Sequence, residues 1–221
     1  MISLKIDIHV HTISSDSTAT VDDVIKAAKE KGLDGVVVTD HDTIEGAEEA
    51  ISKKCGLIII MGEEVTTTNG HILAIGISEP IRKGLPPNIA VFRIHKQNGL
   101  AVIPHQTFPF VSKIPKKELH KIPIDGIEVF SAATPFAWHY FRRNLKLAGS
   151  LGLPMLAGSD SHFAETIGDA YTIVYAENQE TTSILNAIKQ GRTDVGCQPS
   201  KFIYKFKMMK NMGLGLLYSK H

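Results

Sequence analysis

Cysteine, long apolar runs and net charge are all scarce in this sequence. Its two cysteines, Cys55 and Cys197, are too few for a disulfide framework or a thiolate metal site. No apolar run approaches the roughly 20 residues of a membrane span, and residues 1–11 lack the basic and apolar regions of a signal peptide. The formal net charge of +1 provides no overall attraction to nucleic acid or to a membrane. We therefore expect a cytoplasmic protein with no membrane partner, and the composition argues against nucleic acid without excluding it.

Nucleotide-binding and nucleophile motifs are missing as well. The chain contains no GxxxxGK[ST] phosphate loop, no GxGxxG dinucleotide turn and no GxSxG nucleophile elbow. Chemistry that depends on a P-loop, a dinucleotide cofactor or an activated serine is therefore not indicated.

Apolar runs and amphipathic stretches alternate along the chain. The 221 residues, of which 43% are hydrophobic and 21% charged, are enough for one sizeable domain. The pattern predicts strands at 4–11, 35–39, 57–61, 71–77, 100–103, 126–130, 153–157 and 171–175. Helices are predicted at 20–31, 43–54, 89–98, 136–151 and 181–190, with a short lysine-rich helix before 126. Repeated strand-then-helix order favours a parallel α/β sheet, open or closed into a barrel.

The clearest local motif lies on the first predicted strand. Side chains two residues apart on a strand share one face, so Asp7, His9 and His11 point to the same side. Two imidazoles on one face are a ready pair of metal ligands, and Asp7 could orient one of them. The alternative is a half-exposed strand that carries histidines by chance.

Similar groups recur beside other predicted strands. Six of the ten histidines lie at strand ends or starts, with carboxylates between them: His9, His11, His41, His71, His105 and His162. A single histidine in such a place is usually a hydrogen-bonded structural residue, but six are hard to attribute to structure. Imidazole and carboxylate together suit Zn²⁺, Mn²⁺ or Fe²⁺. We interpret the remaining histidines as surface or packing residues: His95, His120, His139 and His221.

These motifs, in this order, resemble those of the polymerase-and-histidinol-phosphatase (PHP) family. The match runs from Asp7-Ile-His-Val-His11 through Thr39-Asp40-His41, Gly62-Glu63-Glu64-Val65 and Pro104-His105 to Gly158-Ser-Asp-Ser-His162. The resemblance implies a distorted (β/α)7 TIM-like barrel with two or three divalent metals at the strand ends. It implies metal ligands at His9, His11, Asp16, His41, Glu64, His71, His105, Asp160 and His162.

One region departs from the family pattern. Many members place a further His, Cys or Asn shortly after the strand that corresponds to 126–130. Here the nearest histidine is His139, at the start of the next predicted helix. The resemblance therefore implies two metals more firmly than it implies a third.

The chain becomes basic after Arg192, where Asp194 is the only acid. We assign residues 1–195 to a PHP-type metal-binding barrel and 196–221 to a basic tail that packs on it or extends from it. Residues 201–207 are predicted to form a closing strand. Their lysines either face solvent or, with the aromatic residues, contact a nucleotide.

The resemblance implies a metal-dependent phosphoesterase acting on a small phosphate ester, such as a nucleotide or sugar phosphate. Clustered divalent metals would supply hydroxide near neutral pH and stabilise charge on the phosphoryl oxygens. Glu64 would bridge two metals, and Asp160 or His162 would accept the proton of the attacking water. Basic side chains at 113, 116, 117, 142 and 143 either bind a substrate phosphate or are surface charge. An amidohydrolase-like hydrolase and a non-catalytic metal-binding regulatory module are the rival interpretations.

Glu63 and Glu64 are adjacent, so on an extended strand only one of them can face the metals. The family motif and the freedom of Gly62 to bend the backbone favour Glu64.

Overall fold

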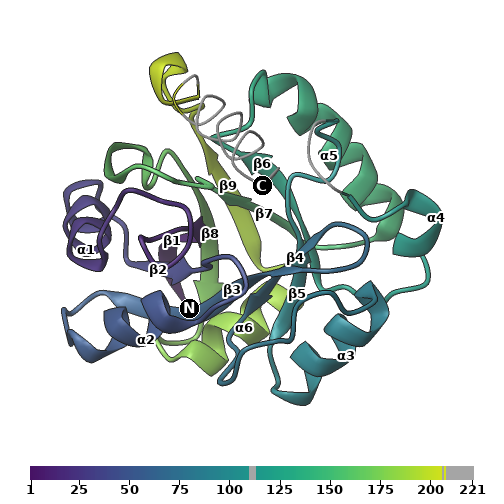
Figure 1. The fold of residues 1–221 in the computed structure, drawn as a ribbon, viewed down its shortest axis with the longest axis horizontal. Coiled ribbons are helices and arrows are strands. Elements are labelled where there is room, and N and C mark those ends of the chain that lie inside the picture. The colour runs from purple at the N-terminus through teal and green to yellow at the C-terminus, as the bar shows by residue number, and fades with distance from the viewer. Residues whose placement is uncertain (110–112, 206, 208–221) are drawn as a thin grey trace, which may run out of the picture.

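A nine-stranded mixed sheet organises the computed structural model, which describes residues 1–109, 113–205 and 207 (Figure 1). The strands are β1 (Ile2–Val10), β2 (Gly35–Val38), β3 (Ile58–Thr66), β4 (His71–Ile75), β5 (Leu100–Ile103), β6 (Gly126–Ser131), β7 (Met155–Gly158), β8 (Ala170–Ala176) and β9 (Thr193–Cys197). The helices around the sheet are α1 (Val21–Glu30), α2 (Glu45–Ser52), α3 (Pro87–Lys96), α4 (Lys116–Leu119), α5 (Ala137–Leu151) and α6 (Thr181–Lys189). A 3-10 turn, η1 (Ala164–Thr166), precedes β8.

The two ends of the sheet approach each other. The strand order is β7-β6-β5-β4-β3-β2-β1-β8-β9. The hydroxyl of Thr193 on β9 donates to the carbonyl of Met155 on β7 (3.0 Å), and the hydroxyl of Thr172 on β8 donates to the carbonyl of Ala157 (3.0 Å). Side chains thus connect the terminal strands into a nearly closed barrel. The expected α/β class and barrel-like shape are confirmed.

The expectation of a parallel sheet is wrong at four pairings. β1 with β8, β3 with β4, β4 with β5 and β8 with β9 are antiparallel. Between β3 and β4 the cause is a tight turn, in which the amide and hydroxyl of Thr67 both donate to the carbonyl of Gly70. Such a short connection can join only antiparallel neighbours.

Strand β3 changes partner at Gly62. Residues 58–61 pair in parallel with β2, and residues 62–66 pair antiparallel with β4. A Cβ on Gly62 would lie 2.7 Å from Cγ1 of Val37, so the crossing of the two pairings requires glycine. The strand therefore does not end at residue 61, as expected, but continues through Glu63 and Glu64.

Both faces of β1 are buried. Ile6 and Ile8 on one face pack in an apolar cluster with α6, and Asp7, His9 and His11 on the other face are also shielded from solvent. The half-exposed strand considered above is therefore wrong, because the barrel covers the polar face. Burying three ionisable groups side by side is costly unless they bind partners.

The end of the described chain also differs from the prediction. Residues 202–205 are helical rather than extended, and the unexpected strand β9 covers 193–197. The alternating apolar residues predicted a strand with the aromatic side chains buried. In the structure Phe202 is 76% exposed whereas Lys205 is only 7% exposed. Residues 208–221 of the predicted basic tail lie outside the described residues. Within the described residues, no helix is long and apolar enough to cross a membrane.

Candidate metal centre

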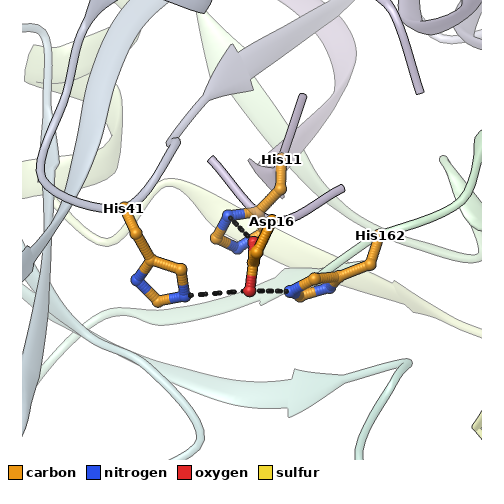
Figure 2. Close-up of side chains that lie close together, drawn as sticks. All are labelled: His11, Asp16, His41 and His162. Carbon is orange, nitrogen blue, oxygen red and sulfur yellow. Dashed lines mark hydrogen bonds and ion pairs between the residues drawn. The ribbon is translucent and has the colours of Figure 1, made fainter. Parts of the chain in front are cut away.

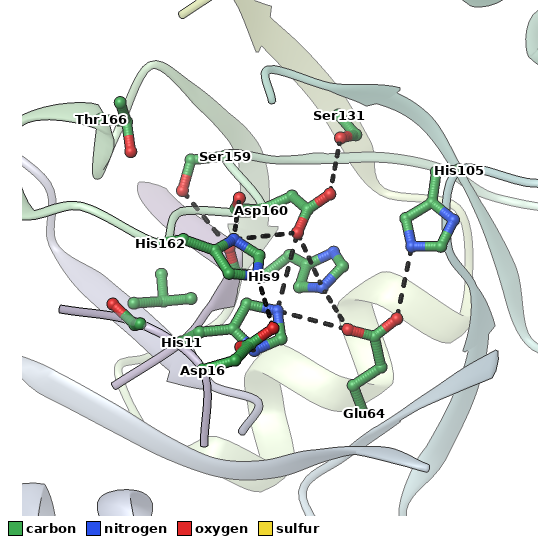
Figure 3. A network of polar contacts seen from close by, with 12 residues as sticks. His9, His11, Asp16, Glu64, His105, Ser131, Ser159, Asp160, His162 and Thr166 are labelled. Carbon is green, nitrogen blue, oxygen red and sulfur yellow. Dashed lines mark hydrogen bonds and ion pairs between the residues drawn. The ribbon is translucent and has the colours of Figure 1, made fainter. Parts of the chain in front are cut away.

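The nine predicted ligands converge at one end of the sheet, and Figure 3 labels all of them except His41 and His71. His9 is the last residue but one of β1, Glu64 lies on the second half of β3, and His105 and Asp160 follow β5 and β7. His71 is the first residue of β4. Because β4 runs antiparallel to its neighbours, its first residue meets the end at which the parallel strands finish. The topology thus brings side chains from distant parts of the sequence together.

Glu64 is at the centre of this group. Its Oε2 lies 3.0 Å from His9 Nε2, 3.3 Å from His11 Nε2 and 3.6 Å from His41 Nε2. Its Oε1 lies 2.9 Å from His71 Nδ1 and 3.3 Å from His105 Nε2. The two oxygens of one carboxylate therefore face different sets of imidazoles. This is the arrangement expected of a carboxylate that bridges two cations.

Glu63 points the other way, as expected of its neighbour on a strand. Its Oε2 accepts a hydrogen bond from the backbone amide of Ile81 (2.7 Å). The side chain is buried against this neighbouring segment and does not face the histidines.

Two aspartates complete the cluster. Asp160 Oδ1 lies 3.6 Å from both His9 Nε2 and His11 Nε2. Figure 2 shows Asp16 Oδ2 between His162 Nε2 (3.2 Å) and His41 Nε2 (3.7 Å).

The donors fall into three groups that share Glu64 or lie beside it. The Asp160 group contains His9, His11, Asp160 and Oε2 of Glu64. The Asp16 group contains His11, Asp16, His41 and His162. The His71 group contains His41, Glu64 and His71, and His105 Nε2 lies beside it, 3.3 Å from Oε1 of Glu64.

The donors in these groups fit divalent metals. Within the described residues, neither ring nitrogen of buried His11 makes a hydrogen bond, nor does Nδ1 of His105. Buried polar atoms without a hydrogen-bond partner are rare, so a bound cation would explain these unpartnered nitrogens. Donors on one tetrahedral zinc, at about 2.0–2.1 Å, lie about 3.4 Å apart. The nitrogen–oxygen distances in the groups run from 2.9 to 3.7 Å.

Backbone strain occurs at two of these positions. His105 and Asp160 both have positive φ, at 29° and 54°. Non-glycine residues adopt such angles at a cost of roughly 1–3 kcal/mol, and they concentrate at functional sites. The Asp160 amide donates to the His9 carbonyl (2.8 Å), which helps to hold the strained conformation.

Glu128 on β6 is a residue that the sequence did not identify as functional. One oxygen lies 3.0 Å from Nδ1 of His9, and the other accepts the backbone amide of His105 (2.9 Å). An Nδ1–H donated to this fully buried carboxylate leaves Nε2 of His9 free for a metal. The only indication in the sequence was an acidic residue inside the apolar strand Gly126–Ser131, to which no functional role was assigned.

Asp7 does not have the role expected for it. Its carboxylate accepts hydrogen bonds from the backbone amides of Ser159 (2.9 Å), Gly168 (2.8 Å) and His9 (3.3 Å), and from none of the imidazole rings that the structure describes. Asp7 thus secures the loop after β7, and Glu128 orients the histidine. Burial is the main reason that the pKa of Asp7 is raised to about 6.

The region that departs from the family pattern contains Ser131. Its hydroxyl donates to Oδ2 of Asp160 (3.1 Å), the oxygen opposite the one that faces the histidines, and the hydroxyl of Thr134 donates to Ser131 (2.9 Å). His139 is exposed on α5, with its ring packed edge-on against Tyr140. The basic side chains considered as phosphate ligands are exposed too: Lys113, Lys116, Lys117, Arg142 and Arg143.

Neighbouring charges in the cluster strongly shift the pKa values of its side chains. Burial would raise the pKa of Glu64, but the imidazoles of His41 and His9 hold it well below its ordinary value. Burial would lower the pKa of His11, but contacts with Asp160 and Glu64 raise it to about 10. The same contacts favour a divalent cation, which competes with protons for these nitrogens.

Comparisons with known proteins agree with this site. The family model described as PHP-associated matches residues 138–193. An uncharacterized protein from Methanocaldococcus jannaschii is 35% identical over 142 residues, which cover 58% of this chain and 82% of that protein. The phosphoribosyl 1,2-cyclic phosphate 1,2-diphosphodiesterase of Eggerthella lenta is 31% identical over 81 residues, 33% of this chain and 31% of that enzyme.

A solved structure has a similar fold. It is a two-domain protein from Bacteroides vulgatus that contains a predicted PHP-like metal-dependent phosphoesterase, with a TM-score of 0.76 and 21% identity. The match covers 89% of this chain and 65% of the other, so the chain spans about two thirds of that protein. The family-model match, together with the relative that is covered over 82% of its length, shows that the chain belongs to the PHP family.

Proposed function

We propose that the protein is a metal-dependent phosphoesterase that hydrolyses a small phosphate ester, such as a nucleotide or sugar phosphate. One observation carries the proposal: the two oxygens of Glu64 face two separate sets of histidines, each within 3.6 Å. A shared carboxylate of this kind is how two-metal hydrolases hold their ions about 3.5–4 Å apart.

The donor groups specify which residues would hold the ions. The Asp160 and His71 groups would hold the pair bridged by Glu64, and the Asp16 group would hold a third. All donors are imidazole or carboxylate, which suits Zn²⁺, Mn²⁺ or Fe²⁺. Bound ions would lower the pKa of water and neutralise charge on phosphoryl oxygens.

The remaining chemistry belongs to the chain itself. Asp160 keeps Oδ2 away from the imidazoles, where the hydroxyl of Ser131 holds it. We assign to Asp160 the role of accepting the proton of the attacking water. His162 is assigned a ligand role, because an Nδ1–H donated to the carbonyl of Asp160 (3.0 Å) leaves Nε2 free beside Asp16.

Phosphorus rather than carbon is favoured as the reaction centre by the named relatives. The Eggerthella lenta relative is named as a diphosphodiesterase, and the Bacteroides vulgatus protein as containing a predicted PHP-like metal-dependent phosphoesterase. Several positive ions at one site also match a substrate that carries two or more negative charges.

The deciding experiment is a substrate screen with Mn²⁺-loaded protein. It should include phosphomonoesters, phosphodiesters, nucleoside bisphosphates, carboxylic esters and amides, each repeated after chelation. We expect cleavage of at least one phosphate ester and its loss on chelation. Cleavage of carboxylic substrates alone would establish an amidohydrolase instead. Metal binding without any turnover would establish a regulatory module.

A further inference from the structure

Residues 200–205 form a segment, here called the closing segment, that lies across two loops of the site. The amide of Ser200 donates to the carbonyl of Ala132, after β6 (3.1 Å). The ring of Tyr204 packs against Phe163, after β7, with centroids 5.6 Å apart. The closing segment therefore connects the loop that follows Ser131 with the loop that carries Asp160 and His162.

A small pocket separates this segment from the metal centre. Asp160 and His162 line it from the metal side, and Ser200, Tyr204 and Lys205 line it from the closing segment. Any group that enters the pocket therefore lies between a metal-ligand cluster and the end of the described chain.

Lys205 is unusual among the lysines. Its side chain is buried, and Nζ donates to the carbonyl of Thr134 (2.8 Å). An ammonium has three hydrogen-bond donors, and among the described residues Lys205 makes no ion pair. Lys31 and Lys53, by contrast, pair with carboxylates on the surface. A buried cation with one neutral acceptor is costly, so a negative ligand beside it would be favourable.

A second donor faces the same pocket. Ser200 is 5% exposed, and its hydroxyl has no partner among the described residues. A buried hydroxyl without a partner costs about 1–3 kcal/mol. One anion in the pocket could accept hydrogen bonds from both Ser200 and Lys205.

We propose that Lys205 and Ser200 form an anion-binding subsite of the metal centre, and that Lys205 contacts a phosphate oxygen of the bound substrate. This inference rests on the proposed phosphoesterase function. It assigns substrate binding to a residue outside the nine predicted ligands. It also gives the closing segment a function other than covering the barrel.

Among the described residues, Asp160 is the one carboxylate that lines this pocket, and it would repel an anion if left uncompensated. Its Oδ1 faces His9 and His11, and its Oδ2 accepts the Ser131 hydroxyl. The charge of Asp160 is therefore directed at the metal centre. We expect anion binding to require metal-loaded protein.

A purely structural role for Lys205 would have different consequences. In that case the lysine would only tie the closing segment to Thr134, and its removal would lower thermal stability without affecting anion binding. The two roles are separated by measuring affinity and stability on the same variants.

The test uses inorganic phosphate as the probe, titrated calorimetrically into Mn²⁺-loaded full-length protein. Lys205→Met removes the charge and keeps the aliphatic stem, and Lys205→Arg keeps the charge. Lys201→Met is the matched control, since Lys201 is exposed on the same segment. A lost charge-assisted hydrogen bond should weaken phosphate binding by about tenfold or more in Lys205→Met. Lys205→Arg should retain more affinity, Lys201→Met should match wild type, and metal content should stay constant.

Two results would overturn the subsite. One is equal phosphate affinity in Lys205→Met and wild type at equal metal content. The other is a lower melting temperature with unchanged affinity, which would make Lys205 a structural tie. If Lys205→Met does not fold, Ser200→Ala replaces it, and unchanged affinity there would count against the subsite.

Ester hydrolysis is measured separately on the same proteins. Phosphate affinity that depends on Lys205 in a protein that cleaves no phosphate ester would remove the proposed function and leave the anion subsite. Full ester cleavage with full phosphate affinity in Lys205→Met would leave the function and remove the subsite.

Discussion

The two walls of the site are built from different chemistry. The wall from β1 to β4 supplies ring nitrogens around the carboxylate of Glu64. The wall from β6 to the closing segment supplies hydroxyl groups, a lysine and only two of the predicted ligands, Asp160 and His162. The first wall is suited to holding cations, and the second is suited to meeting an anion. The difference divides metal binding from substrate binding along the chain.

The largest expected effect lies in the first wall, at Glu64. Glu64→Gln removes the negative charge that five imidazoles surround, and an amide is a poor bridge between cations. Loss of an outer partner of a ligand typically costs about 10–100-fold in metal affinity or activity, and loss of the bridge should cost more. Elemental analysis and turnover after Mn²⁺ or Zn²⁺ loading check this. Wild type should hold at least two metals per chain.

Less than about one metal per wild-type chain would contradict the two-metal site itself. Normal metal content in Glu64→Gln would contradict the central position of Glu64. Either result would break the assignment of cation binding to the first wall.

The first wall could be predicted from the sequence more fully than the second. Its donors lie in short motifs, such as His9-Val-His11, in which strand periodicity fixes the shared face. The choice of Glu64 over Glu63 depended on the family motif and on the freedom of Gly62 to bend, and the opposite orientations of the two side chains agree with it. The ligand roles themselves remain predictions.

The second wall depends on contacts between residues far apart in sequence, which no local pattern records. Glu128 meets His9 across 119 positions, and Lys205 meets Thr134 across 71. The burial of Lys205 was not predicted, because a strand at 201–207 would bury the alternating aromatic side chains and expose the lysines. The antiparallel direction of β4 was missed because repeated strand-then-helix order favoured a parallel sheet, although Asn69-Gly70 before β4 is typical of a tight turn.

The next prediction joins the two walls through Glu128. Glu128→Gln keeps a group that can accept from the His105 amide, but it removes the charge opposite Nδ1 of His9. We expect a decrease of about 10–100-fold in metal affinity, as for other residues that orient a ligand. Competition with a metal-sensitive dye measures the affinity, and a melting curve checks the fold. Unchanged affinity would show that β6 only supports the core.

A smaller effect is expected at Ser131 in the second wall. Ser131→Ala removes the hydrogen bond to Oδ2 of Asp160, worth about 1 kcal/mol or roughly fivefold in rate. The carboxylate should also become easier to protonate, so the acid limb of the pH–rate profile should move to higher pH. Metal content should not change. An unshifted acid limb would argue against Asp160 as the proton acceptor.

The smallest effect on function is expected at Glu63, the matched control for Glu64. Glu63→Gln should keep wild-type metal content and turnover, because its side chain faces Ile81 rather than the histidines. Its effect should appear in stability instead. Burial is the main cause that raises the pKa of Glu63 from 4.5 to about 7, with a contribution from Asp42.

The sign of that effect follows from proton linkage. The folded protein holds this proton more tightly than the unfolded chain, so wild type loses stability as pH rises from about 4.5 through about 7. Glutamine cannot ionise and escapes this loss. In chelated protein, Glu63→Gln should therefore melt at a higher temperature than wild type at pH 8.5, and the difference should disappear only as pH falls below about 4.5. Melting curves across this range, with elemental analysis of the loaded proteins, measure both predictions. If Glu63→Gln loses metal and Glu64→Gln does not, the side-chain alternation along β3 is assigned wrongly by one residue. Glu63 would then be the metal ligand of the first wall.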